Sequence, residues 1–381
     1  MPLCGRPTFA EIDMDALRHN LRSAREFIGN EVKIMAVVKA NAYGHGAIEC
    51  ARVLESESVD WFGVALIEEA VELRGAGISK PILCLGGCST GDERDLLEFN
   101  ITPVIFNLEQ AGALQMAASD AGQIMRVHIK IDTGMGRLGI RWNKLDAFIK
   151  QLAAFSNLKV EGLMSHYAAA NDINENDFTR LQLDRFFESL SKFEAAGLRP
   201  EIIDIANSPG AVGHHDSRFG MIRLGGVLYG LGEDTLSDKL PKPELIPVMS
   251  LYSSIADIKE VREGETVGYG RTFTCNRDTR IALLPIGYND GYRRLLSNKA
   301  NVIINGRLAA VIGRISMDWT IVDVTEVPDA KIGSTVIMIG RENGLEVSAA
   351  DLGTFADTIS YEITCGIGSR IPRKYVDKKA D

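Results

Sequence analysis

Short apolar runs alternate with amphipathic segments from about residue 32 to residue 230. Eight of the apolar runs have the length of buried strands, namely residues 33–38, 60–65, 81–85, 102–106, 126–131, 159–165, 202–205 and 221–223. Helical patterns lie between them at residues 67–76, 92–99, 145–154 and 177–196, and the last begins in an Asn/Asp-rich segment suited to capping. Eight strand–helix repeats predict an α/β fold, a (β/α)8 barrel. A doubly wound open sheet stays an alternative, because a strand is easily misassigned in a single sequence.

The pattern changes after Gly232. Prolines at positions 241, 243 and 247 mark a linker, and the runs beyond it are β-rich. Residues 302–308 predict a hairpin, because Asn305-Gly306 suits the two positive-φ positions of a type I′ turn. Further strands are expected at residues 320–325 and 336–339, and one helix at residues 349–357, capped by Ser348.

Two domains follow from these patterns. We expect a barrel over residues 13–240 and a mostly β domain over residues 241–381. Residues 7–12 also have the pattern of a short strand, which could pair with either domain; we group the first twelve residues with the second domain.

Composition narrows the choice of partners and compartment. The 381 residues are 45% hydrophobic and 24% charged, enough for a sizeable core. The net charge of −9 opposes binding to nucleic acid. No run approaches the length of a membrane span, and Glu11, Asp13 and Asp15 lie where a secretory signal would be basic and then apolar, so we expect a cytoplasmic protein without a membrane partner. Cys84 and Cys88 lack the two-residue spacing of a zinc or redox pair, which predicts reduced thiols and no metal site.

Polar side chains follow the predicted barrel strands at their carboxyl ends, where barrel enzymes build active sites. They include Lys39, Tyr43, Lys130, Arg137, His166, Ser208 and Arg223, with Gly225 and Gly226 after the last strand. Lys39 follows four apolar residues, so partial desolvation should lower the pKa of its amine and favour a Schiff base. The ordinary alternative is a lysine that extends to water.

Other residues at these strand ends suit an anion. Ser208, the Gly225-Gly226 backbone and the Tyr43 hydroxyl could bind a phosphate, although a Gly-Gly pair is more often a plain turn. Arg137 and Arg223 are either surface ion-pair formers or fixed donors for a planar anion or a ring nitrogen. Signals at five strand ends support one another, and together they indicate a cofactor site.

The segment around Lys39, Ala36-Val-Val-Lys39-Ala-Asn-Ala-Tyr43-Gly-His-Gly, resembles the pyridoxal-phosphate attachment motif of alanine racemases. The resemblance continues through nearly the whole chain. Further matching segments are Thr133-Gly-Met-Gly-Arg137-Leu-Gly, Arg223-Leu-Gly-Gly-Val-Leu-Tyr229-Gly, Val267-Gly-Tyr269-Gly-Arg, Pro285-Ile-Gly-Tyr288-Asn-Asp-Gly-Tyr292, Gly313-Arg-Ile-Ser-Met317-Asp318 and Arg370-Ile-Pro-Arg.

The resemblance implies a pyridoxal 5′-phosphate enzyme that interconverts L- and D-alanine, supplying D-alanine for bacterial peptidoglycan. It also implies a head-to-tail homodimer with shared active sites. The counterpart of Lys39 binds the cofactor covalently and is the base for the D-enantiomer, and that of Tyr269, from the partner subunit, is the base for the L-enantiomer. Two bases on opposite faces of Cα suit racemisation. His166, hydrogen-bonded to Arg223, would favour the phenolate of Tyr269.

The resemblance assigns further roles. Arg223 would face the pyridine nitrogen and leave it unprotonated, which restrains transamination. Arg137 would bind the phenolic oxygen of the cofactor and the substrate carboxylate, while the Met317 N–H and Asp318 come from the partner chain. Tyr288 is assigned to substrate binding. Lys130 occupies a position that is carbamylated in several members; the alternative is an ordinary lysine paired with an aspartate.

One position departs from the family pattern. Some relatives carry a tyrosine where this chain has Ser369, and the smaller side chain leaves room for substrates larger than alanine. A serine or broad-specificity racemase, or a related barrel decarboxylase, is therefore an alternative, although the Lys39 and Tyr269 pair favours racemisation. A non-catalytic pyridoxal-phosphate-binding protein is a third interpretation, and the predicted β domain argues against it.

Overall fold

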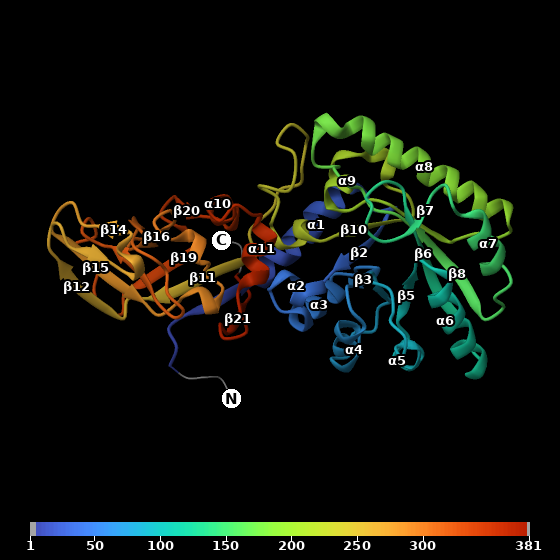
Figure 1. Ribbon diagram of the computed structural model, residues 1–381, viewed down its shortest axis with the longest axis horizontal. Helices are drawn as coiled ribbons and strands as arrows, with labels where there is room; N and C mark the ends of the chain where they lie inside the picture. Colours follow the sequence, from blue (N-terminus) through green and yellow to red (C-terminus); the bar gives the residue numbers. More distant parts are fainter. Residues whose placement is uncertain (1–4, 379–381) are drawn as a thin grey trace. The chain divides into compact units, whose positions relative to one another are not determined.

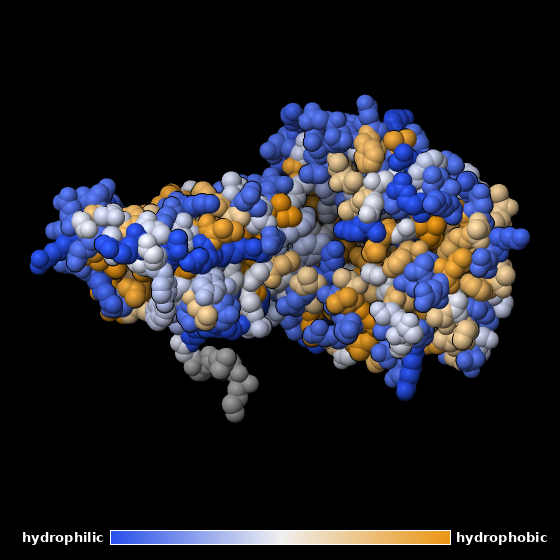
Figure 2. Space-filling view, in the orientation of Figure 1, coloured by the Kyte–Doolittle hydropathy of each residue, from blue (hydrophilic) through white to orange (hydrophobic). Residues whose placement is uncertain are grey.

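The computed structural model describes residues 5–378, which form two compact units. The barrel unit comprises residues 17–42 and 47–245. The β unit comprises the segment that ends at Ala16, residues Tyr43–Gly46, and the chain from Ile246 onward. Figure 2 shows hydrophilic residues spread over the visible surface with apolar residues scattered among them. Within residues 5–378, every helix is too short or too polar to cross a membrane.

Eight parallel strands form the sheet of the barrel unit, in the order β10-β2-β3-β4-β5-β6-β8-β9. They are β2 (Lys33–Val37), β3 (Trp61–Val64), β4 (Ile82–Cys84), β5 (Thr102–Ile105), β6 (Met125–Asp132), β8 (Leu158–Met164), β9 (Ile202–Asp204) and β10 (Met221–Leu224). A two-residue strand, β7 (Ile140–Arg141), pairs with β6. The N–H of Arg223 in β10 donates to Ala206 O, just after β9, at 3.0 Å. The eight expected strands and the nearly closed barrel are confirmed, and the open sheet is excluded.

Helices follow the strands around the outside of the barrel (Figure 1). They are α3 (Ala47–Ser56), α4 (Ile67–Gly75), α5 (Glu93–Glu98), α6 (Leu108–Asp120), α7 (Asp146–Leu152), α8 (Asn176–Ala195) and α9 (Ser208–Gly213), preceded by α1 (Met14–Ile28). The four expected helices are confirmed as α4, α5, α7 and α8. Capping before α8 differs from expectation: the Asp172 side chain accepts from Asn174 N within a 3-10 turn, η1 (Ile173–Glu175), so the capping group acts one turn earlier.

Inward-facing side chains fill the barrel. One buried cluster comprises Met35, Trp61, Leu83, Val104, Met164, Ile202 and Met221, one from each of seven strands. Side chains two residues apart in a strand share a face. Asp204 and Arg223, two residues after Ile202 and Met221, therefore also point inward, nearer the carboxyl ends of the strands.

Antiparallel pairing dominates the β unit. Its largest sheet has the order β17-β16-β19-β11-β1-β21, with β20 paired to β19, beside a β12-β15-β18 sheet and a β13-β14 pair. The strands are β1 (Phe9–Asp13), β11 (Met249–Ser254), β12 (Asp257–Val261), β13 (Thr266–Val267), β14 (Phe273–Thr274), β15 (Thr279–Leu284), β16 (Asn301–Ile304), β17 (Arg307–Ala310), β18 (Thr320–Asp323), β19 (Thr335–Glu342), β20 (Leu345–Val347) and β21 (Arg373–Val376). The first strand, β1, pairs with β11 and β21 and therefore belongs to the largest sheet of the β unit.

Local sequence signals account for two features of this unit. Asn305 and Gly306 have φ of 51° and 71°, as the predicted type I′ hairpin requires. Ser348 Oγ accepts from Asp351 N at 3.0 Å and caps α10 (Ala349–Phe355), as expected. A second helix, α11 (Ser360–Gly366), was not predicted from the sequence, because no side-chain cap marks its start and it carries β-branched residues.

Candidate active site

Lys39 lies two residues after the end of β2, at the start of a left-handed backbone turn. The next four residues have φ close to +54°, and none of them is glycine: they are Ala40, Asn41, Ala42 and Tyr43. This turn is labelled α2 (Lys39–Tyr43) in Figure 1. A left-handed conformation costs an L-residue about 1–2 kcal/mol. Such strain persists only where surrounding contacts enforce it, and it is typical of functional sites.

Glu69, on α4, supplies the contacts that hold the start of this turn. Its Oε1 accepts from Ala40 N at 2.6 Å, and its Oε2 accepts from Ala65 N at 2.7 Å and Leu66 N at 3.2 Å. One carboxylate thus joins the strand-end loops after β2 and β3. The sequence analysis did not select Glu69, because its role depends on an approach between segments 29 residues apart.

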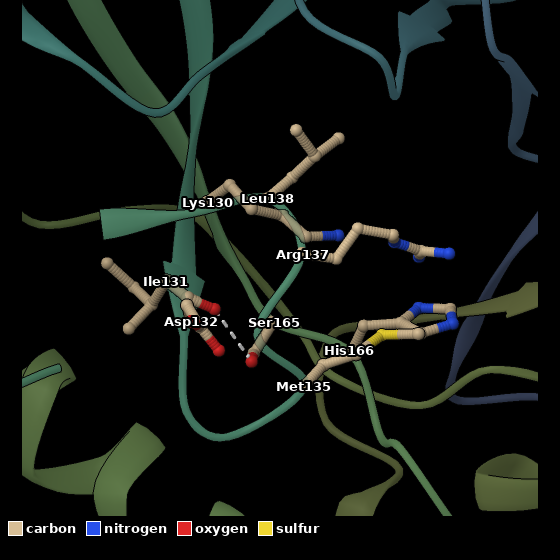
Figure 3. Close-up of a pocket in the computed structure, with 8 residues that line it drawn as sticks. All are labelled: Lys130, Ile131, Asp132, Met135, Arg137, Leu138, Ser165 and His166. Carbon is tan, nitrogen blue, oxygen red and sulfur yellow. Dashed lines mark hydrogen bonds between the residues drawn. The ribbon is translucent and has the colours of Figure 1, made fainter. Parts of the chain in front are cut away.

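Lys130 is a buried lysine on β6. Burial, followed by the neighbouring charges of Arg223, Arg137 and Lys39, holds the pKa of its amine well below the usual range. Figure 3 shows the side chains of Lys130, Arg137 and His166 extending in the same direction along the pocket that they line, while the side chain of Ile131, which also lines it, extends to the opposite side. The barrel therefore brings four of the expected cationic residues together.

Asp132 shapes the loop that carries Arg137. Its carboxylate accepts from the N–H groups of Gly134 and Gly136, each at 3.0 Å, and from Arg141 Nη1 at 2.9 Å. Burial alone would raise the pKa of Asp132, but these hydrogen bonds lower it overall. A Cβ on Gly139 would lie 2.5 Å from Asp132 N, so the loop closes against the strand only with glycine there.

His166 accepts a hydrogen bond in this pocket. Arg223 Nη2 lies 3.1 Å from His166 Nδ1, and because arginine only donates, Nδ1 is the acceptor and Nε2 carries the proton. Burial, together with the charges of Arg223, Lys130 and others, holds the pKa of His166 well below its usual range. His166 is therefore neutral at pH 7.

Arg223 is buried and held on both sides of its guanidinium. Nη2 also donates to Ser165 O at 2.7 Å and Ile205 O at 3.2 Å, and Nη1 forms an ion pair with the buried Asp204. Burial and the charge of Arg137 lower the pKa of Arg223 to about 9, which leaves it cationic at pH 7. The sequence analysis missed Asp204, although a charged residue at an inward position of a buried strand was a visible signal.

Ser208 and Gly225 are in direct contact. Ser208 is the first residue of α9, whose N-cap Asn207 accepts from Gly210 N at 3.1 Å. The Ser208 hydroxyl accepts from Gly225 N at 2.9 Å, and Gly226 begins the 3-10 turn η3 (Gly226–Tyr229). The expected hydroxyl and backbone amides thus lie together after β9 and β10.

The remaining expected residues belong to the β unit. Tyr43 packs edge-on against Tyr361, with ring centroids 5.2 Å apart, and burial raises the pKa of its hydroxyl. Tyr269 is 71% exposed in the 3-10 turn η4 (Tyr269–Arg271), between Gly268 and Gly270 with φ of 74° and 71°. Its phenol is therefore presented on the surface of this unit.

Tyr288, Met317 and Asp318 lie on two loops that contact each other. Tyr288 N donates to Ser316 O at 3.0 Å, and Asp318 accepts from Arg370 Nη2 at 2.9 Å. Tyr288, Met317 and Trp319 are all more than two-fifths exposed. The β unit thus carries Tyr269, Tyr288 and Met317 on exposed loops.

Comparisons with known proteins cover both units. The family model "Alanine racemase, N-terminal domain" matches residues 12–233, and "Alanine racemase, C-terminal domain" matches residues 248–375. The chain is 42% identical over 375 residues to the alanine racemase of Geobacter sulfurreducens and 40% identical over 373 residues to that of Halothermothrix orenii, in each case over 98% of both chains.

Solved structures agree with these matches. The alanine racemase of Clostridium difficile 630 has a TM-score of 0.92 at 36% identity, covering 99% of this chain and 97% of that one. The alanine racemase of Bacillus anthracis, solved with bound L-Ala-P, has a TM-score of 0.91 at 33% identity, covering 99% of this chain and 96% of that one. With two domain models matched and relatives similar over their full length, the chain belongs to the alanine racemase family.

Proposed function

We propose that this protein interconverts L-alanine and D-alanine with pyridoxal 5′-phosphate as its cofactor, and so supplies D-alanine for peptidoglycan. The observation that carries the proposal is the group of Lys130, Arg137 and Arg223 around a neutral His166. Relatives that match over their full length are named alanine racemases, and two of the solved structures hold L-Ala-P or cycloserine.

The residues of the barrel unit fit this cofactor. Lys39, Arg137 and Arg223 place excess positive charge around His166, which favours an anionic ligand. Gly225 N–H donates to Ser208 Oγ, which leaves the Ser208 hydroxyl proton and the Gly226 amide as donors for a phosphate, and we assign the Tyr43 hydroxyl to the same group. When bound through Lys39, pyridoxal 5′-phosphate supplies a conjugated ring that stabilises negative charge at Cα of the substrate.

Two residues would exchange the Cα proton. Lys39 serves the D-enantiomer, and Tyr269 serves the L-enantiomer from the opposite face, since racemisation needs a proton removed on one side and delivered on the other. The exposure of Tyr269 on its own unit supports a role toward a second chain. We therefore propose a homodimer in which Tyr269, Met317 and Asp318 of one subunit complete the site of the other.

Charged neighbours would set the protonation states. A neutral His166 can orient the Tyr269 hydroxyl and accept from Arg223 at the same time. Arg223 stays cationic at pH 7, so a ring nitrogen that faces it remains unprotonated and transamination is restrained. Arg137 would bind the substrate carboxylate together with the Met317 N–H, and Tyr288 would line the substrate path.

Lys130 is proposed to be carbamylated. Carbon dioxide reacts with a neutral amine, and burial already lowers the pKa of this one. The alternative partner, Asp132, already accepts from Gly134, Gly136 and Arg141. A carbamate would place an anion beside Arg137. A mass increase on Lys130 would support the modification.

Ser369 supports a second candidate function, a racemase for serine or a broader set of amino acids. It is an exposed, small side chain in the β unit, where some relatives carry tyrosine. We also propose a cytoplasmic location. Among the described residues, the cysteines at positions 50, 84, 88, 275 and 365 form no disulfide bonds, as a reducing compartment favours, and Cys4 lies outside the described residues.

The test is to purify the protein, record the near-ultraviolet and visible absorbance of lysine-bound pyridoxal 5′-phosphate, and measure interconversion for a panel of L- and D-amino acids. Alanine should be turned over fastest in both directions. Faster turnover of serine would favour the second candidate. A colourless protein that stays inactive after cofactor addition would overturn the assignment.

A further inference from the structure

A buried carboxylate lies directly behind the arginine of the proposed site. Asp204, the last residue of β9, has no exposed surface, and its Oδ1 forms an ion pair with Arg223 Nη1. Both side chains point into the barrel, because each follows a core residue, Ile202 or Met221, by two positions. The pair therefore lies at the carboxyl-terminal end of the barrel interior.

The partners of Arg223 differ in charge. Nη2 donates to two backbone carbonyls, those of Ser165 and Ile205, and to His166 Nδ1, all of which are neutral. Asp204 adds the negative charge. A buried guanidinium without a counter-charge is costly, and its loss of a proton or its displacement relieves that cost.

Other cations lie around Arg223, so the negative charge of Asp204 is needed to keep the guanidinium charged. The charge of Arg137 acts on Arg223 itself, and Lys39 and Arg137 both act on the neighbouring His166, so this region has an excess of positive charge. Without Asp204, the field of these cations would favour the neutral form of Arg223 or a rotation of its side chain away from them. Either change would break the contact with His166.

We propose that Asp204 is a positioning residue that keeps Arg223 charged and fixed against His166. Asp204 acts only through Arg223 and touches neither substrate nor cofactor in this role. The role of Arg223 toward the cofactor rests on the proposed function, whereas the ion pair between Asp204 and Arg223 does not.

A set of four variants of the full-length chain tests the pairing. Asp204→Asn keeps the shape and removes the charge, Arg223→Gln removes the opposite charge, and the double variant removes both. Glu161→Gln is the matched control, since Glu161 is another buried barrel carboxylate whose arginine partner, Arg126, is 60% exposed.

Thermal unfolding is measured first, with and without pyridoxal 5′-phosphate. Asp204→Asn should lower Tm by about 10 °C, because it leaves a buried charge uncompensated. Adding Arg223→Gln should restore most of that loss, whereas Glu161→Gln should cost less because Arg126 can turn to solvent. A double variant no more stable than Asp204→Asn alone would overturn the pairing.

Kinetics then test the positioning role. Asp204→Asn should lower kcat/KM for both enantiomers of alanine by about 10²-fold. The alkaline limb of its pH profile should move to lower pH, because Arg223 then loses its proton more readily, and Asp204→Glu should return the limb toward its original position. In the Arg223→Gln background, Asp204→Asn should have little further effect on kcat/KM or on the pH profile. An equal effect in both backgrounds, or an unmoved alkaline limb, would overturn the role.

These experiments separate the two proposals. A wild-type chain that neither binds pyridoxal 5′-phosphate nor racemises alanine contradicts the proposed function. Thermal unfolding without cofactor depends neither on cofactor binding nor on racemisation. If Arg223→Gln fails to restore the stability of Asp204→Asn in that measurement, only the Asp204 proposal is contradicted.

Discussion

Arg223 Nη2 lies 3.1 Å from His166 Nδ1, and this contact determines which nitrogen of His166 carries the proton. Arginine can only donate, so Nδ1 accepts and Nε2 is left to donate to a further group. Burial, followed by the charge of the same guanidinium, lowers the pKa of His166 and keeps the ring neutral. The contact with Arg223 thus fixes the orientation of His166 and adds to the effect of burial on its charge.

Tyr269→Phe should impair proton removal from L-alanine more than from D-alanine, because the phenolic oxygen is the proposed base for the L-enantiomer. Loss of a general base costs about 10²–10⁴-fold in rate. Exchange of the Cα hydrogen in deuterated water, measured from each enantiomer, gives the two effects separately. Tyr252→Phe on β11, whose ring stacks on Phe9, is the control. Equal loss from both enantiomers would argue against the assigned faces.

Glu69→Gln should destabilise the left-handed turn after Lys39. The carboxylate accepts three backbone N–H bonds, and a charged acceptor contributes about 1.5–3 kcal/mol per hydrogen bond, part of which the neutral amide retains. We expect a loss of about 2 kcal/mol in the free energy of unfolding, measured in urea, and weaker cofactor binding. Glu68→Gln, an exposed neighbour on the same helix, should change neither. Unaltered stability in both variants would show that Glu69 does not enforce the turn.

Gly139→Ala should be much more damaging than Gly136→Ala. Both glycines have positive φ, 127° and 70°, in the loop that carries Arg137. A Cβ at position 139 would lie 2.5 Å from Asp132 N, whereas one at position 136 meets open space. Gly136→Ala should cost about 1–2 kcal/mol from backbone strain alone, and Gly139→Ala clearly more. Urea unfolding of the two proteins compares them, and equal losses would rule out the steric argument.

His128→Gln should reduce the sensitivity of the fold to acid. Burial, followed by the charge of Arg223, lowers the pKa of His128 from 6.5 to about 3, so the ring is neutral in the fold. Below pH 6.5 the unfolded chain binds a proton that the folded chain does not, and stability is lost as pH falls toward 3. The slope is about 1.4 kcal/mol per pH unit for this residue.

The measurement is urea unfolding from pH 7 to pH 4. His128→Gln should have a shallower acid loss than the wild-type protein, and the exposed His215→Gln should match the wild-type slope. An unchanged slope for His128→Gln would mean that this ring does not carry the acid sensitivity.

Local pattern alone was sufficient for much of the fold. The eight barrel strands follow from apolar runs, the hairpin at Asn305-Gly306 from residues that tolerate positive φ, and α10 from the Ser348 cap. Each signal is contained in a few adjacent residues. The helix α11 escaped prediction because its seven residues are stabilised by packing of Ser360, Ile363 and Thr364 rather than by propensity.

Some residues of the site could likewise be identified from the sequence, and others only from the structure. Lys39, Arg137 and Arg223 were identifiable from the sequence, because polar residues at strand ends interrupt an apolar pattern and lie in family motifs. Only the tertiary structure decided that Asp204 pairs with Arg223 and that Glu69 holds the turn after Lys39. The physical reason is that a chain of residues specifies its own periodicity and turns, whereas the charge and geometry of a buried group depend on side chains brought beside it from distant strands by barrel closure.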